Sequence, residues 1–252
     1  MSKDLAQQTA LVTGATAGIG RATALALAAR GADIIVHGRD EERAADALRR
    51  IEALGATARF EPADLSDPLE VTELAERAGE VDILVNNAGI FHFAHTADTD
   101  PTTFDAHIAV NLRAPYLLVQ ALAPGMTRRG HGAIINISSG AATTPGSGSG
   151  IYGATKAALE SLTRVWAAEY GPGGVRVNAV AAGPTRTEGT AAYGDAFESA
   201  GQAVALKRLA GPEEIAGAVA FMASPDASYV NGATLSAMGG QPALGQVQHL
   251  PE

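Results

Sequence analysis

The chain has 252 residues, of which 46% are apolar, and its formal net charge is −9 at pH 7. This length and apolar content predict one large α/β domain over residues 1–252, and the acidic balance argues against a nucleic-acid partner. Cysteine is absent, which excludes disulfide bridges and thiolate metal sites. The first residues, MSKDLAQQTALVTG, are partly charged and polar where a signal peptide would be apolar, and no apolar run of 18 residues occurs. We therefore expect a cytoplasmic protein that makes no membrane contact.

Short apolar runs alternate with longer amphipathic stretches along the whole chain. The runs predict strands at residues 10–13, 33–36, 58–60, 83–85, 133–137, 175–180 and 233–235. The stretches, several of which open with Pro or Asp and close with Gly, predict helices at residues 18–30, 40–54, 68–78, 101–129, 152–170 and 212–223. This alternation is typical of βαβ units. It predicts a doubly wound Rossmann-type α/β fold, with a parallel sheet of about seven strands and helices on both faces.

Two segments interrupt this alternation. Residues 140–150 are rich in Gly, Ser and Thr, and residues 184–211 form a weakly patterned insertion that carries Tyr193 and Phe197. Both follow the predicted carboxyl end of a strand, where ligands bind in open α/β sheets. We expect both to contact the substrate, with residues 184–211 as the main substrate loop; the alternative is a disordered surface loop. The tail, residues 241–252, is expected to be a loose end or a subunit contact.

A glycine-rich turn follows the first predicted strand. Gly14, Gly18 and Gly20 have the spacing G-x-x-x-G-x-G, and Thr16 and Ile19 belong to the same turn. Glycine permits a tight turn and close approach of a pyrophosphate to the backbone, and the amides at a helix start attract phosphate. Glycine also marks ordinary turns, but a position between a strand and a helix favours a dinucleotide site.

The end of the second predicted strand is where an acidic residue would hold the ribose hydroxyls of NAD. The chain reads His37, Gly38, Arg39, Asp40 here. Arg39 offers a planar fork for a 2′-phosphate, and Asp40 stands where the next helix needs an N-cap. NADP(H) is therefore favoured over NAD(H). The alternative is that Arg39 is a solvated surface residue and Asp40 binds the ribose.

Tyr152 and Lys156 lie four residues apart, so one helical turn would bring a phenol beside an ammonium. A positive neighbour lowers the pKa of a phenol, which suits the phenol to exchange a proton with a carbonyl oxygen. Ser138 and Ser139 precede this pair, and because consecutive strand residues point to opposite faces, only one would reach the same pocket. Taken singly, these groups fit an ordinary helix face and a solvated strand end. Combined with the glycine-rich turn, they indicate an oxidoreductase.

Seven ordered motifs give the chain a resemblance to the short-chain dehydrogenase/reductase family over nearly its whole length. They are TGATAGIG from Thr13, Asp64 with Leu65, NNAG at residues 86–89, Asn111 in VNLRAPY, INISSG at residues 135–140, YGATK at residues 152–156, and VNAVAAGPTRT at residues 177–187. Two positions depart from the family pattern. Ala182 replaces the proline before Gly183, with proline shifted to Pro184, and a typical Val-Asp-Gly-Gly is replaced by AMGG at residues 237–240.

The resemblance implies roles for particular residues in the cofactor site. Asp64 and Leu65 would flank the adenine, and Lys156 would hydrogen-bond the nicotinamide ribose. The remaining cofactor contacts are expected from Asn87, Ala88 and Gly89 on the ribose side and from Gly183, Thr185 and Thr187 at the carboxamide.

For catalysis, the resemblance implies Tyr152 as the acid/base and selects Ser139, thirteen residues before it, to orient the substrate oxygen. Asn111 would hold a water that connects Lys156 to solvent. A homotetramer or homodimer built on the helices from residues 101 and 152 is expected. The implied activity is hydride transfer between NADP(H) and a carbonyl or secondary alcohol: a 3-oxoacyl thioester, a keto-sugar or keto-acid, or a hydrophobic ketone. The alternative is a catalytically silent NAD(P)-binding regulator or scaffold of the same fold.

His92 and His95 form an H-x-x-H pair after the NNAG motif. Helical spacing could bring both to a metal, but no third ligand is evident and the segment follows a strand, so no metal is expected. We expect His92 and His95, with Phe93, to shape the substrate pocket instead, and Tyr193 to contact the substrate.

Overall fold

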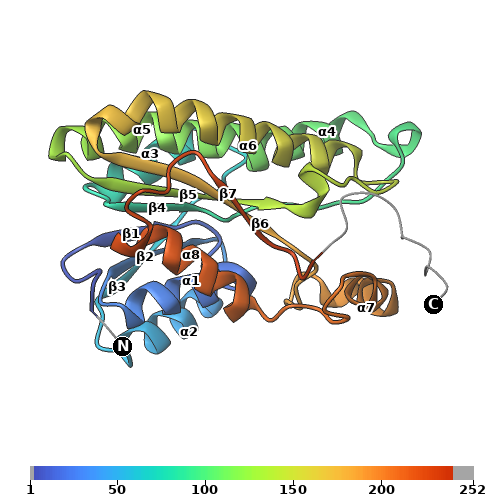
Figure 1. Cartoon of the computed structure of the whole chain (residues 1–252), viewed down its shortest axis with the longest axis horizontal. Helices are drawn as coiled ribbons and strands as arrows, with labels where there is room; N and C mark the ends of the chain where they lie inside the picture. Colours follow the sequence, from blue (N-terminus) through green and yellow to red (C-terminus); the bar gives the residue numbers. More distant parts are fainter. Residues whose placement is uncertain (1–2, 241–252) are drawn as a thin grey trace, which may run out of the picture.

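The computed structural model describes residues 3–240. Its centre is a seven-stranded parallel sheet in the order β3-β2-β1-β4-β5-β6-β7 (Figure 1). The strands are β1 (Thr9–Val12), β2 (Asp33–Gly38), β3 (Ala58–Pro62), β4 (Ile83–Asn86), β5 (Gly132–Ser139), β6 (Val175–Ala182) and β7 (Thr234–Ala237). The order reverses direction between β1 and β4, which is where open α/β sheets form a ligand crevice at their carboxyl ends.

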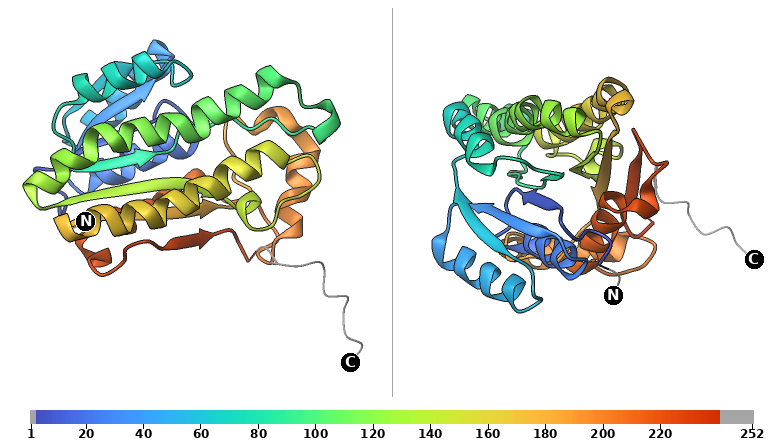
Figure 2. Two further views of the ribbon diagram at one scale, coloured as in Figure 1. Left: turned by 90° about the horizontal axis from the view of Figure 1, so that it is seen from above. Right: turned by 90° about the vertical axis from the view of Figure 1, so that its left-hand side faces the viewer.

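Helices cover both faces of the sheet, which confirms the predicted doubly wound fold (Figures 1 and 2). One layer consists of α1 (Gly18–Ala29), α2 (Glu41–Glu52) and α8 (Pro212–Ala223). The other consists of α3 (Pro68–Ala78), α4 (Pro101–Ile108), α5 (Ala114–Arg129) and α6 (Gly150–Tyr170). None of the helices between residues 3 and 240 combines the length and the apolar character that crossing a membrane requires.

Each helical layer has its own apolar core against the sheet. On the first face, Leu27 of α1, Ile51 of α2 and Val219 of α8 are fully buried against β1 and β2. On the second face, Leu74 of α3 and Leu118 of α5 are fully buried on the opposite side of the same strands. Strands buried on both faces read as continuous apolar runs, which is why their positions could be predicted from the sequence.

The structure differs from the predicted elements at two places. The helix predicted at residues 101–129 is divided by a π-helical turn, η2 (Ala109–Arg113). The insertion at residues 184–211 is not an irregular loop, since it contains η5 (Ala191–Tyr193) and α7 (Gly194–Ala203). Helix α7 has no side-chain N-cap and no proline at its start, so it lacks the usual sequence signals. In Figure 1 it lies at the end of the molecule away from the N-terminus.

Aspartate side chains begin three of the helices. Asp40 accepts a hydrogen bond from the backbone N–H of Arg43 at 2.9 Å, as the predicted N-cap of α2. Asp67 and Asp100 cap α3 and α4 in the same way, each followed by a proline. The Asp40 carboxylate therefore serves as the N-cap of α2, and Arg39 lies just before it at the carboxyl end of β2. The tail at residues 241–252 lies outside the described residues.

Candidate functional site

The glycine-rich turn joins β1 to α1 at the crevice. Gly14 has φ +65° and Gly18 has φ +51°, backbone angles that favour glycine. Gly20 allows the helix to approach the turn, because a Cβ atom there would lie 2.1 Å from the Gly14 carbonyl oxygen. The tight turn therefore directs the first backbone N–H groups of α1, which have no partner within the helix, toward the crevice.

A carboxylate already uses this anion-binding turn. Glu188 Oε2 accepts a hydrogen bond from the Gly18 N–H at 3.0 Å, and Glu188 Oε1 forms an ion pair with Arg21 Nη2 at 2.5 Å. Burial acts to raise the pKa of Glu188, but hydrogen bonds from its own backbone and from Arg21 prevail and hold the pKa below its usual range. Because the turn accepts an anionic oxygen from the protein itself, its donors fit a phosphate group.

His37 holds the glycine-rich turn in place through hydrogen bonds, a role that the sequence did not reveal. The Gly14 N–H donates to His37 Nδ1 at 3.1 Å, and His37 Nε2 lies 3.1 Å from the Ala63 carbonyl oxygen. Since Nδ1 accepts a hydrogen bond, the ring proton lies on Nε2. Burial lowers the pKa of His37 to about 4, so the ring stays neutral and this tautomer is kept.

Asn87 ties the turn to the end of β4. Its Nδ2 donates to the Thr13 carbonyl oxygen at 2.8 Å and to the Gly14 carbonyl oxygen at 3.3 Å. The Thr13 hydroxyl in turn accepts from the N–H groups of Asn87 at 2.9 Å and Ala88 at 3.0 Å. These contacts bring the NNAG motif beside the glycine-rich turn, although the Asn87 amide group serves the backbone.

The residues predicted for the adenine end lie along the ends of β2 and β3. Arg39 is 74% exposed, and its Nη1 is 4.0 Å from Asp64 Oδ2. Leu65 is buried, and Thr16 packs against Gly38, where a Cβ would lie 2.5 Å from Thr16 Cγ2. The guanidinium is therefore free to turn toward an anion at this edge.

A cavity of about 530 Å³ opens at the carboxyl ends of the central strands. Twelve of the predicted site residues line it: Gly18, Ile19, Gly20, Asn87, Gly89, Phe93, Ser139, Tyr152, Lys156, Gly183, Thr185 and Thr187. The start of α1, the carboxyl ends of the strands and the insertion at residues 184–211 therefore all line the same cavity. The predicted residues outside its lining are Gly14, Thr16, Arg39, Asp64, Leu65, Ala88, His92, Asn111 and Tyr193.

Tyr152 and Lys156 occupy the same cavity, but their pKa values differ from the simple expectation. Lys156 Nζ is buried, lies 5.9 Å from the centroid of the Tyr152 ring and donates to the Ile137 carbonyl oxygen at 2.8 Å. Burial lowers the pKa of Lys156 to about 8. Burial also raises the pKa of Tyr152, against a weaker lowering by a hydrogen bond with Ser139. The expected lowering of the phenol pKa by Lys156 is therefore wrong, because desolvation determines the direction of the shift.

The two serines at the end of β5 point in different directions. Ser139 forms a hydrogen bond with Tyr152, and its Oγ also accepts from the Ala141 N–H at 3.2 Å. Ser138 Oγ instead donates to Glu160 Oε1 of α6 at 2.6 Å, in a buried pair. The alternation of strand residues thus places only Ser139 beside the tyrosine.

Asn111 lies in the π-helical turn η2 and is almost fully buried. Its Oδ1 accepts from the Ile90 N–H at 2.8 Å, and its Nδ2 donates to the Ile90 carbonyl oxygen at 2.9 Å and to Thr155 Oγ1 at 3.2 Å. A Cβ on Gly89 would lie 3.3 Å from Asn111 Oδ1 and 3.4 Å from Lys156 Nζ. The amide oxygen and the ammonium therefore converge on the space beside Gly89.

The segment after NNAG presents its aromatic rings, and not its histidines, to the cavity. Phe91 and Phe93 line it, whereas His92 and His95 are exposed. The expectation that His92 and His95 shape the pocket is wrong, because neither histidine lines the cavity. His95 Nδ1 lies 3.3 Å from Ser147 Oγ. Within residues 3–240, no cluster of three or more His, Cys, Asp or Glu side chains has the arrangement of a metal site.

Tyr193 lies one layer behind the cavity wall. Its ring centroid is 5.9 Å from those of Phe91 and Phe93, and its hydroxyl donates to the Phe91 carbonyl oxygen at 3.2 Å. Phe91, His37 and Glu188 are site residues that the sequence analysis missed. Only Phe91 carried a signal, since it has a two-residue spacing to Phe93.

The two departures from the family pattern meet in space. Ala182 of β6 pairs in register with Ala237 of β7, and the Gly183 N–H donates to the Ala237 carbonyl oxygen at 3.0 Å. A Cβ on Gly183 would lie 2.7 Å from Met238 Cα. The altered positions therefore form one backbone contact beside the cavity and leave its polar groups in place.

Comparisons with known proteins agree with this geometry. The model of a family described as enoyl-(acyl carrier protein) reductase matches residues 14–241. A solved structure of a short chain dehydrogenase/reductase family protein is 51% identical, covers 94% of this chain and 98% of its own, and has a TM-score of 0.88.

Two further relatives carry cofactor names. A short chain dehydrogenase of Burkholderia cenocepacia J2315, solved in complex with NADP, is 37% identical, with coverage of 94% of this chain and 99% of its own and a TM-score of 0.85. L-rhamnose 1-dehydrogenase (NAD(P)(+)) of Sphingomonas sp. (strain SKA58) is 37% identical over 247 residues, which are 94% of this chain and 97% of that protein. With its crevice, its glycine-rich turn and these relatives, the chain belongs to the short-chain dehydrogenase/reductase family of oxidoreductases.

Proposed function

We propose that this protein interconverts a carbonyl and a secondary alcohol with NADP(H), using Tyr152 as the acid/base. The observation that carries the proposal is that Ser139, Tyr152 and Lys156 line the same cavity as the glycine-rich turn. A phosphate held by the turn would direct the rest of a dinucleotide toward that trio. The coenzyme, when bound, supplies or accepts the hydride at the carbonyl carbon.

The protein's own residues manage the proton. In the reductive direction the carbonyl oxygen gains an electron pair as the hydride arrives, and the Tyr152 hydroxyl gives it a proton. Ser139, which already hydrogen-bonds Tyr152, would donate a second hydrogen bond to that oxygen and fix its position. The positive charge of Lys156 would favour the tyrosinate left behind, because a nearby cation stabilises a phenolate.

The proton on Tyr152 is then replaced from the side of Lys156. We infer that a water beside Gly89 links the Lys156 ammonium to Asn111 Oδ1, because both polar atoms face that space. Asn111 is suited to this role since its two hydrogen bonds to Ile90 hold its amide in one orientation. The Lys156 ammonium has three N–H donors, and one of them bonds the Ile137 carbonyl oxygen. Another would donate to the nicotinamide ribose.

The preference for NADP(H) over NAD(H) is proposed on two grounds. Arg39 carries a largely exposed guanidinium next to Asp64, and Asp40 is occupied as the N-cap of α2. A relative that covers 94% of this chain was solved in complex with NADP, and another is named for use of either coenzyme. Gly14, Thr16, Ile19, Leu65 and Ala88 would complete the coenzyme site, with Gly183, Thr185 and Thr187 at its carboxamide end.

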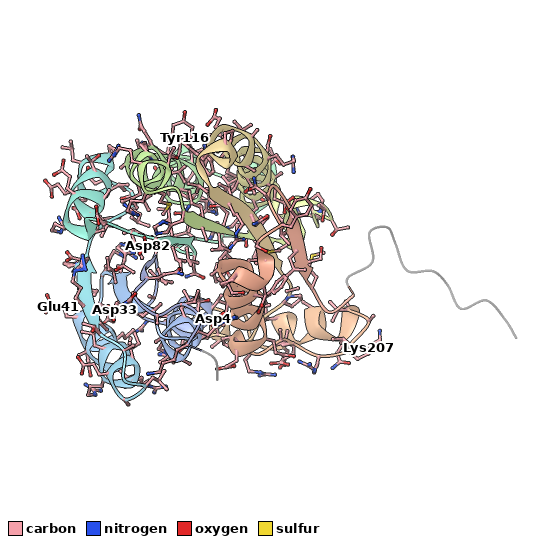
Figure 3. The ribbon with its side chains drawn as sticks, turned by 60° about the vertical axis from the view of Figure 1, so that its left-hand side comes forward. Asp4, Asp33, Glu41, Asp82, Tyr116 and Lys207 are labelled. Carbon is pink, nitrogen blue, oxygen red and sulfur yellow. The ribbon has the colours of Figure 1, made fainter. Side chains whose placement is uncertain are left out.

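We also propose that residues 184–211 close over the substrate and that the protein assembles as a homotetramer or homodimer through α5 and α6. Phe197 and Ala200 of α7 line the cavity, which supports the first point. Tyr116 of α5 is 49% exposed and lies on the outer side of its layer (Figure 3), and Val165 of α6 is 45% exposed. Light scattering on the purified protein tests the assembly.

The test of function is turnover of a panel of ketones with NADPH, followed by the absorbance of the reduced coenzyme, and compared with Tyr152→Phe. We expect Tyr152→Phe to bind NADPH normally and to lose activity by at least about 100-fold. Activity that survives this substitution would remove the mechanism. Coenzyme binding without turnover of any ketone or alcohol would favour a silent binding protein instead.

A further inference from the structure

The substrate end of the cavity is walled by aromatic rings. The ring centroid of Tyr152 lies 5.8 Å from that of Phe93 and 6.5 Å from that of Phe91, and both pairs meet edge to face. Phe197 of α7 also lines the cavity. Tyr193 packs against the three phenylalanines, with its ring centroid 6.4 Å from that of Phe197. Its hydroxyl donates a hydrogen bond to the Phe91 carbonyl oxygen. A substrate must therefore pass between aromatic rings to reach the Tyr152 hydroxyl.

Charged groups are nearly absent from this wall. Among the described residues that line the cavity, Lys156 is the only one with an ionisable cationic side chain, and no carboxylate lines it. The Lys156 ammonium is buried and donates to the Ile137 carbonyl oxygen. A substrate carboxylate would thus be desolvated without a cation of its own, which is strongly unfavourable.

Three hydroxyl groups of the wall donate their protons to backbone carbonyl oxygens. Thr144 donates to the Gly140 carbonyl oxygen at 3.0 Å, Ser149 to Gly146 at 2.7 Å, and Thr185 to Gly183 at 2.9 Å. The one side-chain amide in the lining, that of Asn87, donates to Thr13 and Gly14. A polyhydroxylated substrate would find few donors for its many oxygens.

Phe93 is the feature that points to a ligand. It lines the cavity and yet remains 44% exposed, although it has neighbouring rings on one side. An apolar ring at the mouth of a cavity loses exposed surface when another apolar group packs on it. The free face of Phe93 therefore favours a second ring entering beside Tyr152.

We propose that the substrate is a ketone that carries an aromatic ring, or the matching secondary alcohol, with no carboxylate and few hydroxyl groups. Its ring would lie among Phe91, Phe93 and Phe197, with the carbonyl oxygen at Ser139 and Tyr152. Aromatic pairs at these separations are stabilised beyond the burial of their apolar surface. This inference rests on the proposed function, since it names the substrate class of the same site.

A matched set of ketones tests the substrate class with NADPH. Phenylacetone and phenylpyruvate share the ring and the ketone but differ in a methyl against a carboxylate; cyclohexylacetone keeps the size and removes the aromatic ring; fructose supplies a keto-sugar. We expect kcat/KM for phenylacetone to exceed that for phenylpyruvate by at least about 100-fold, with fructose lower still. Phenylacetone should also exceed cyclohexylacetone by about 3- to 10-fold.

A pair of variants tests the wall itself. Phe93→Leu keeps an apolar side chain and removes the ring, so the preference for phenylacetone over cyclohexylacetone should fall to near equality. Phe104→Leu is the control, because Phe104 is similarly exposed but lies on α4 outside the cavity. The control should keep the wild-type preference, and a loss of preference in both variants would contradict the role of Phe93.

The failures of the two proposals are distinguishable. Turnover of phenylpyruvate or fructose as efficient as that of phenylacetone, and abolished by Tyr152→Phe, would overturn the inferred substrate class and leave the oxidoreductase mechanism standing. If no ketone is reduced, the mechanism fails, and calorimetry with NADPH-loaded protein then decides the inference. Binding of phenylacetone in preference to phenylpyruvate supports it, and equal or absent binding overturns it.

Discussion

The Glu188 carboxylate accepts a hydrogen bond from the Gly18 N–H at 3.0 Å, across 170 positions of the chain. This contact ties the start of the insertion at residues 184–211 to the start of α1, and Thr187 also packs on Gly18, where a Cβ would lie 3.2 Å from Thr187 Cβ. An anion of the protein thus uses a donor that a coenzyme phosphate needs, so binding must displace or reorient it.

Glu188→Gln is therefore expected to strengthen NADPH binding by about 3- to 10-fold, because it removes a competing negative charge of a half-exposed ion pair worth up to about 1 kcal/mol. Fluorescence titration with NADPH measures the affinity. Glu198→Gln is the control, since Glu198 pairs with Arg186 in the same insertion and has the same 47% exposure. Weaker binding by Glu188→Gln would mean that the carboxylate helps to close the site over the coenzyme.

Arg39→Ala should weaken NADPH binding by about 10- to 100-fold and leave NADH binding nearly unchanged, because a charge-assisted contact with the 2′-phosphate is lost. The measurement is the ratio of the two dissociation constants. Arg43→Ala provides a matched control, as it lies in the first turn of α2, is 60% exposed and pairs with Asp40. Equal losses for both coenzymes would defeat the assignment of Arg39.

Lys156→Met should stabilise the protein without coenzyme while it abolishes turnover. Burial lowers the pKa of Lys156 from 10.5 in the unfolded chain to about 8 in the folded one, so folding at neutral pH carries the cost of a buried charge. That cost is on the order of 3 kcal/mol, and loss of the bond to Ile137 offsets about 1 kcal/mol, which leaves a gain of about 2 kcal/mol.

The sign of the pH dependence provides the check on this prediction. Between pH 8 and pH 10.5 the unfolded wild-type chain holds a proton on this lysine that the folded chain has released, so wild-type stability rises with pH. The advantage of Lys156→Met should be complete below pH 8 and shrink toward pH 10.5. Urea unfolding of both proteins across that range measures it, and a constant difference would exclude the titration of Lys156 as the cause.

Gly20→Ala should reduce NADPH binding by at least about 10-fold and destabilise the fold by about 1–3 kcal/mol, because its Cβ would overlap the Gly14 carbonyl oxygen. Gly217→Ala is the opposite case, since a Cβ on this α8 glycine meets nothing within 4 Å. It should stabilise by up to about 1 kcal/mol through helix propensity. Thermal unfolding and NADPH titration distinguish the two, and tolerance of Gly20→Ala would show that the turn relaxes easily.

The sequence predicted those features of the fold that depend on local signals. Helix α3 has the predicted bounds because Asp67 caps it, Pro68 opens it and Gly79 follows it. Ser139 could be preferred to Ser138 on the motif spacing, and the alternation of strand residues then gave the two opposite faces. Helix α7 was missed because its start carries no such signals.

Features that depend on distant parts of the chain could not be read from local patterns. Glu188 reaches Gly18, and His37 reaches Gly14, only because the sheet brings their strands together. The helical spacing of Tyr152 and Lys156 was correct, but the sign of the phenol pKa shift depends on how deeply both groups are buried, which spacing does not contain.

The number of residues in the π-helical turn η2 determines where the Asn111 side chain lies relative to the cavity. A π turn holds one residue more than an α turn, and that extra residue lies in the five that include Asn111. Deleting one of the other four would let the backbone continue as ordinary α-helix with little rotation of α4 relative to α5, but Asn111 would lose the position that brings its amide to Ile90 and Gly89. Insertions and deletions near position 111 should therefore damage activity far more than the same changes on an exposed helix of similar length.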